Sequence, residues 1–106
     1  MHRFDELAGR LRSVMQAYAA KHGGAVSLAE FGDAVARAQG LAVPYSPAVV
    51  ADWMDGRTAP SFAIFAAIAA AGGYESGYQR GWIAFGAEHR NHAVDEATYN
   101  RYHRLP

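Results

Sequence analysis

The stretch that decides the fold is residues 46–61, which read SPAVVADWMDGRTAPS. Ser46 followed by Pro47 has the form of a helix start, with a serine N-cap and a proline at the first helical position. We expect this helix to end at Gly56, because glycine readily takes the left-handed conformation that closes a helix. Pro60 holds the residue before it in extended backbone, so a tight loop separates this helix from the next.

Two further helices are expected on the N-terminal side of this stretch. Apolar residues within 4–18 recur at intervals of three and four, as one face of a helix requires, and the glycine pair 23–24 ends that helix. Ser27 and Glu30 have the spacing of a capping box, which starts a second helix that stops at Gly40.

A glycine inside the second expected helix indicates close packing. Gly32 lies beside the apolar stripe of that helix, where a glycine costs about 1 kcal/mol relative to alanine. We therefore expect another helix to approach closely at Gly32. Residues 41–45 form the connector to the helix that starts at Ser46.

On the C-terminal side the pattern predicts helices only. Ser61 can cap a helix over 62–71, a short helix follows over 78–85, and a weaker pattern predicts a last one over 95–104. No strand alternation or hairpin dipeptide occurs, so the predicted class is all-α.

Composition excludes several classes of protein. With 106 residues the chain is expected to form one compact domain, and its formal net charge of zero argues against a strongly basic coat for nucleic acid or membrane. The absence of cysteine excludes disulfide scaffolds and thiolate zinc sites. Acidic residues precede the first apolar run, and the most apolar stretch is half the length of a membrane span, so a cytoplasmic protein without membrane contact is expected.

Three pieces of the sequence together resemble the Cro/lambda-repressor-like helix-turn-helix family. They are Trp53, the GRTAPS element at 56–61 and the WIAFG element at 82–86. The resemblance covers residues 4 to 86 and implies a five-helix DNA-binding domain over 1–86. Residues 87–106 would then be a short helical tail, a possible dimerisation helix.

This resemblance implies a sequence-specific, repressor-like transcriptional regulator that binds double-stranded DNA. The helix over 46–55 would enter the major groove, where alanine and valine can meet thymine methyls and aspartate can accept from cytosine. Arg57 is the cation best placed to contact the phosphate backbone. The residues expected at the DNA are Ser27, Tyr45, Ser46, Ala48, Val49, Asp52, Arg57 and Thr58.

A second hypothesis, binding to a protein instead of to DNA, stays open. Family members join the second and third helices by three or four residues, whereas the link here is nearer six, and two aspartates and one arginine give 44–61 a net charge of −1. The helix-turn-helix scaffold could instead bind a protein through Ala48, Val49 and Ala51, as an antitoxin or regulatory adaptor does. Tyr45 could touch DNA or close the longer link, and Arg57 could instead pair with Asp55 or cap a helix.

Signals for catalysis and metal binding are weak, and no cofactor is expected. His89, His92 and Asp95 are spaced at three and six residues, which spreads them around a helix instead of converging them on a metal. No serine or threonine lies in a nucleophile motif, so the chain is not expected to be an enzyme. Tyr99 and Tyr102 could pack on their own domain or at an interface, and the resemblance favours a homodimer through this segment.

Overall fold

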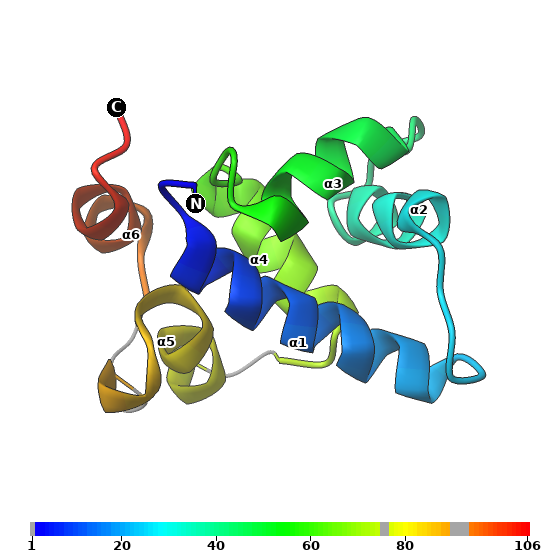
Figure 1. Ribbon diagram of the computed structural model, residues 1–106, viewed down its shortest axis with the longest axis horizontal. Coiled ribbons are helices and arrows are strands. Elements are labelled where there is room, and N and C mark those ends of the chain that lie inside the picture. The colour runs from blue at the N-terminus through cyan, green and yellow to red at the C-terminus, as the bar shows by residue number, and fades with distance from the viewer. Residues whose placement is uncertain (1, 75–76, 90–93) are drawn as a thin grey trace.

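The computed structural model describes residues 2–74, 77–89 and 94–106, and within these ranges all regular structure is helical (Figure 1). The prediction of an all-α protein is therefore confirmed. The elements are α1 (Asp5–Lys21), α2 (Leu28–Ala38), α3 (Pro47–Asp55), α4 (Phe62–Ala71), α5 (Gly77–Phe85), a single 3₁₀ turn η1 (Ala87–His89) and α6 (Glu96–His103).

The helix ends lie where the sequence predicts them, because local hydrogen bonds define them. The hydroxyls of Ser27, Ser46 and Ser61 each accept from the backbone N–H three residues on, at 3.0, 3.2 and 3.3 Å. Glu30 completes the capping box by accepting from the backbone N–H of Ser27. Gly56 closes α3 with φ +80°, the left-handed conformation that glycine adopts at low cost.

The core forms where α1 packs against α3, α4 and α5 and where α2 packs against α3 and α4. Leu11 and Val14 of α1 are fully buried, and so are core residues from α2 to α6. Trp53 is buried, while Trp82 is half-buried and packs on the edge of the same core. The other fully buried members of this core are Phe31, Val35, Val50, Phe65, Ile68, Ala69, Ile83, Ala84 and Tyr99.

Gly32 is the point at which α2 meets the α3 segment. A Cβ at Gly32 would overlap the carbonyl oxygen of Tyr45 and lie 3.2 Å from Cγ2 of Val50. The carbonyl of Gly32 also accepts from the backbone N–H of Tyr45 at 3.4 Å. The expected close approach is therefore present, and it involves the end of the connector as well as the helix behind it.

The C-terminal segment is part of the same core. Tyr99 of α6 is fully buried, its ring centroid lies 4.8 Å from that of Phe65, and its hydroxyl donates to the carbonyl of Pro60 at 2.8 Å. Burial also raises the pKa of Tyr99 above its ordinary value, so the hydroxyl stays a donor. Tyr99 and Tyr102 were expected to pack either on their own domain or at an interface. Tyr99 packs within its own chain, and Tyr102 remains 49% exposed.

None of the helices within 2–74, 77–89 and 94–106 has the length and apolar character that crossing a bilayer requires.

Candidate nucleic-acid interface

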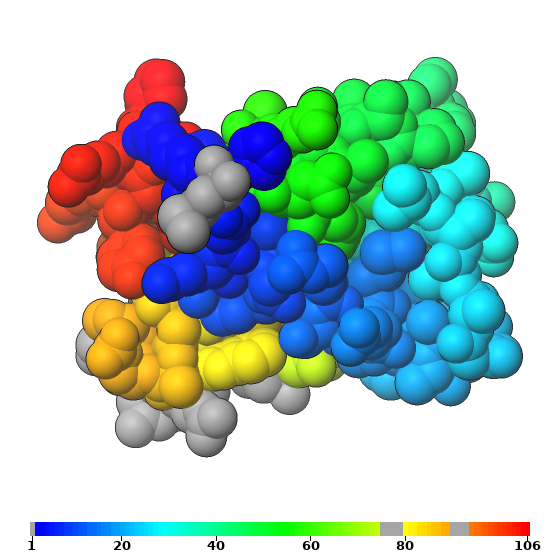
Figure 2. Space-filling view, viewed as in Figure 1, coloured from blue at the N-terminus to red at the C-terminus, as the bar shows by residue number. Residues whose placement is uncertain are grey.

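Helix α3 has one buried side and one open side. Val50 and Trp53 hold its back in the core, with 0% and 4% of their surface exposed. Ser46 and Ala48 are exposed on the other side, and Val49 is 40% exposed. The helix runs along an outer edge of the molecule beside α2, at the upper right of Figure 2. A partner can therefore reach this side of α3 without unfolding the protein.

Asp52 lies at the limit of that open side. It is half-buried, and its carboxylate has no hydrogen bond or ion pair with any residue in the described ranges. Its backbone carbonyl accepts from Arg57 N at 3.0 Å and from Thr58 N at 3.4 Å. These two bonds fold the loop back onto the end of α3.

The amino ends of α2 and α3 present two serine hydroxyls. Ser27 and Ser46 are both exposed, and each uses its oxygen to accept a capping bond. A hydroxyl that accepts one bond still carries a proton that it can donate. Both serines can therefore cap their helices and donate to a phosphate oxygen at the same time.

Arg57 and Thr58 are exposed in the loop that follows α3. Within the part of the chain that the structure describes, the guanidinium of Arg57 makes no hydrogen bond or ion pair, so neither a pair with Asp55 nor a cap on helix carbonyls is formed. The cation is held near α3 by its backbone while its side chain is open to solvent.

This loop is attached at both ends to the terminal segments of the chain. The N–H of Phe4 donates to the carbonyl of Gly56 at 3.0 Å, and the hydroxyl of Tyr99 donates to Pro60. A Cβ at Gly56 would also lie 2.9 Å from backbone atoms of Phe4 and Asp5. The place of Arg57 therefore depends on residues far away in the sequence.

Tyr45 has the contacts that close the connector. Its hydroxyl donates to Oε1 of Gln39, and its ring meets Trp53 edge-on with centroids 5.1 Å apart. Tyr45 was expected either to touch DNA or to close the longer link. Its contacts with Gln39 and Trp53 are those of a residue that closes the link.

Four cations in or just before α1 are used to close other helices. Arg12 donates to Met54 at the end of α3, and Lys21 to Gly72 at the end of α4. Arg10 donates to two carbonyls in the last turn of α5, at 2.7 and 3.2 Å, and Arg3 to two at the end of α6, at 3.2 and 3.1 Å. The last carbonyls of a helix have no partner within it and carry partial negative charge, so these bonds are favourable. Burial lowers the pKa of Arg10 from its ordinary value. Sequence reasoning did not find this role, since no local pattern indicates it.

Three large apolar side chains are exposed in the connector and in α3, and we call this set the connector patch. It consists of Leu41, Val43 and Val49, which are 46%, 76% and 40% exposed. Val49 is one of the residues predicted to bind DNA, whereas Leu41 and Val43 were predicted only to be part of the connector. Exposed apolar side chains of this kind are what the alternative hypothesis, binding to another protein, requires.

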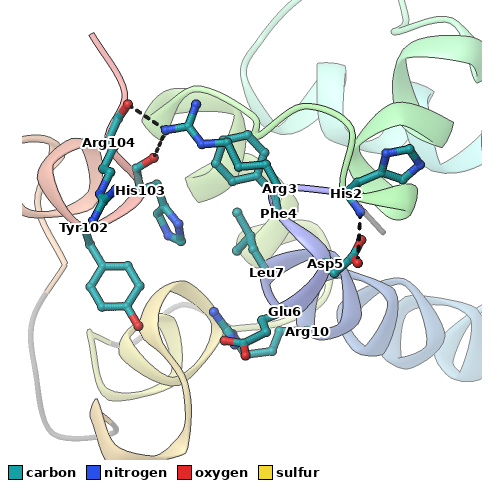
Figure 3. A pocket seen from close by; sticks show the side chains of 10 residues that line it. All are labelled: His2, Arg3, Phe4, Asp5, Glu6, Leu7, Arg10, Tyr102, His103 and Arg104. Atoms are coloured by element: carbon teal, nitrogen blue, oxygen red, sulfur yellow. Dashed lines mark hydrogen bonds between the residues drawn. The ribbon is translucent and has the colours of Figure 1, made fainter.

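A separate cleft of about 520 Å³ lies between the start of the chain and the end of α6 (Figure 3). Arg3, Phe4 and Arg10 line one side, and Tyr102 and His103 line the other. No sequence pattern indicates this site, because its two sides are about a hundred positions apart in the chain.

Metal-binding groups are few. The described ranges contain no group of three histidine, aspartate or glutamate side chains that could hold a metal ion. His92, which the sequence analysis considered with His89 and Asp95, lies outside the described residues.

Comparison with protein-family models, with curated proteins and with solved structures finds no match for the chain.

Proposed function

We propose that the protein is a cytoplasmic, sequence-specific DNA-binding regulator of the repressor type, with α2 and α3 as its helix-turn-helix. The observation that carries the proposal is that α3 is buried on one side and exposed on the other. Val50 and Trp53 fix the helix to the core while Ser46, Ala48 and Val49 stay open. A short helix held in this way can project one side into a major groove about 12 Å wide.

Contacts to the DNA backbone would come from residues around α3. Arg57 and Thr58 at its C-terminal end and Ser27 and Ser46 at helix amino ends all have donors that can face phosphates. Arg57 is the principal contact in this proposal because its guanidinium has no other partner among the described residues.

Sequence would be read by the small apolar side chains and one carboxylate. Ala48 and Val49 can contact thymine methyl groups, and Asp52 can accept a hydrogen bond from cytosine N4. This set predicts a preference for sites that combine thymines with a cytosine.

We propose a homodimer on this DNA, because two copies of such a domain bind half-sites one helical turn apart. With Tyr99 inside the core, a dimer contact through the C-terminal segment would depend on the exposed ring of Tyr102. A palindromic binding motif is the expected signature.

The connector patch supports a second candidate function, binding to another protein. Leu41 and Val43 in the connector and Val49 in α3 expose apolar surface, and in the stretch 44–61 two aspartates, Asp52 and Asp55, outnumber the single Arg57. An antitoxin or regulatory adaptor would use such a surface, and its binding would depend little on salt.

Selection from random duplexes followed by a salt titration distinguishes the two functions. For a DNA-binding regulator we expect an enriched palindrome and a log affinity that falls linearly with log salt, by about 0.9 per phosphate contacted. No enriched motif, together with retention that does not change with salt, would contradict DNA binding and favour the protein partner.

A further inference from the structure

The cleft between the first residues and the end of α6 has the size of a small-molecule site. Its volume of about 520 Å³ lies in the range usual for ligand pockets. Phe4 and Leu7 contribute apolar surface to it, and the half-exposed ring of Tyr102 stands at one side (Figure 3). A flat organic molecule can therefore find contact surface there.

His103 places an unpartnered hydrogen-bond acceptor in the wall of this cleft. Its side chain is only 8% exposed, and its Nε2 lies 2.8 Å from the carbonyl oxygen of Ala84. A carbonyl can only accept, so Nε2 carries the proton and the neutral ring has a lone pair on Nδ1. Within the described residues, Nδ1 of His103 has no hydrogen-bond partner. Every buried side-chain nitrogen or oxygen in these residues does have one, so Nδ1 is not among the buried atoms. Nδ1 therefore reaches solvent, and the cleft is the space that His103 lines.

Arginines give the cleft an excess of positive charge. Arg10 uses Nε and Nη2 for the end of α5, which leaves Nη1 without a bond to the described residues. The guanidinium of Arg104 is likewise unpaired there. Of the two acids in the lining, Asp5 accepts from the backbone of His2 at the side of Gly56, and Glu6 interacts with Arg10. Arg3 is the third arginine in the lining, so the cleft is lined by three guanidinium groups and two carboxylates.

We propose that this cleft binds a small organic anion that also carries a hydroxyl or N–H donor, as a hydroxy acid does. The anionic group lies at the arginines, the donor faces Nδ1 of His103, and the body of the molecule lies against Tyr102.

Occupation of the cleft acts on the Arg57 loop, a part of the proposal that rests on the proposed DNA-binding function. The segment of Phe4 and the helix of His103 form the cleft, and the same segment and helix hold Gly56 and Pro60 through Phe4 N and the hydroxyl of Tyr99. A ligand that draws the two sides together fixes both anchors of the loop. The cleft is thus an effector site that tunes the phosphate contact.

Three matched probes test the chemistry on the full chain without DNA. NMR amide shifts are titrated with 4-hydroxybenzoate, with benzoate, which lacks the donor, and with phenol, which lacks the charge. We expect 4-hydroxybenzoate to shift Leu7, His103 and Arg104 with a dissociation constant of about 1 mM or lower, and the other two probes to bind about fivefold more weakly. Absence of a saturable shift at these residues, or equal affinity for all three probes, overturns the site.

Two arginine variants supply the matched control. Arg104→Gly removes the cation and suits the left-handed backbone at φ +57°, so the fold is retained and binding of 4-hydroxybenzoate weakens about fivefold. Arg101→Ala removes an exposed arginine of the same helix that does not line the cleft, and binding stays unchanged. An equal loss in both variants overturns the site.

The effect on the loop is read in the same titration. The amides of Arg57 and Thr58 should shift with the same saturation curve as His103. Saturation of the cleft without a shift at these two amides overturns the regulatory part. Because no DNA is present, a protein that fails to bind DNA gives a different pattern: normal cleft titration and no enriched duplex.

Discussion

The cations in or just before α1 and Arg57, in the loop that follows α3, have different roles, although each carries the same formal charge. Arg3, Arg10, Arg12 and Lys21 donate to the ends of four helices, whereas Arg57 has no partner within the described ranges. The first group stabilises the fold and the second is available to a ligand. A count of charges along a sequence therefore says little about the capacity to bind DNA, because packing decides which cations remain free.

Of the substitutions considered, replacement of Arg10 should change the stability of the protein most. Arg10→Met keeps the length of the side chain but removes the bonds to Ile83 and Ala84, and we expect the free energy of unfolding to fall by about 2 kcal/mol. Urea denaturation measures the change, with Arg101→Met as the exposed control. A loss equal to that of the control would mean that the α1 cations are not structural.

Acid tests the same region by adding a charge next to Arg10. Burial, and secondarily the charge of Arg10, lower the pKa of His103 in the folded protein. The unfolded chain therefore takes up a proton near pH 6.5 that the folded chain does not, and stability falls as the pH drops below that value. One such proton changes stability by at most about 1.4 kcal/mol per pH unit.

Denaturation curves recorded from about pH 7.5 to about pH 5, on both sides of the ordinary histidine pKa, provide the measurement. His22→Gln, which alters an exposed histidine, should retain the pH dependence, whereas His103→Gln should reduce it. An unchanged curve for His103→Gln would place the acid sensitivity elsewhere.

Arg57→Ala should give the opposite pattern to Arg10→Met. Stability should change by less than about 0.5 kcal/mol, since exposed side chains without partners contribute little. Affinity for all DNA sequences should fall by about 1 kcal/mol, and the salt slope should decrease by about 0.9, the value for one phosphate. Fluorescence anisotropy at several salt concentrations checks this. A stability loss as large as that of Arg10→Met would remove the contrast between the two groups.

The smallest effect is expected from Asp52→Ala. Since its carboxylate has no partner in the described chain, removal should leave the fold intact and relax the preference for cytosine at one position, by about 0.5–1 kcal/mol. Competition between duplexes that differ at this base is the appropriate assay. A uniform gain for every duplex would instead indicate that Asp52 only repels phosphate.

Local chemistry explains which parts of the fold could be predicted. Serine caps, the glycine at the end of α3 and the spacing of apolar residues at three and four positions depend on neighbours within four positions, and the helix boundaries follow from them. The open side of α3 also follows, because Val50 and Trp53 must face the core together.

Long-range contacts explain what could not be predicted. Arg10 reaches a carbonyl 73 positions away, and Arg3 reaches one 100 positions away. The burial of Tyr99 beside Phe65 likewise depends on how α6 folds back onto α4. The cleft, with His103 in its wall, exists only once that folding is complete, so no spacing in the sequence indicates it.

The attachment of Tyr45 to Gly32 separates the placement of α3 from the length of the link before it. The chain is hydrogen-bonded at Leu41, whose N–H donates to the carbonyl of Ala36, and again at Tyr45, so the exposed residues 42–44 lie between two attachments. Insertions there cost little, since loop entropy rises slowly with length. Over evolutionary time this link can therefore drift in length and composition, and acquire new surface chemistry, without disturbing the orientation of the helix that follows.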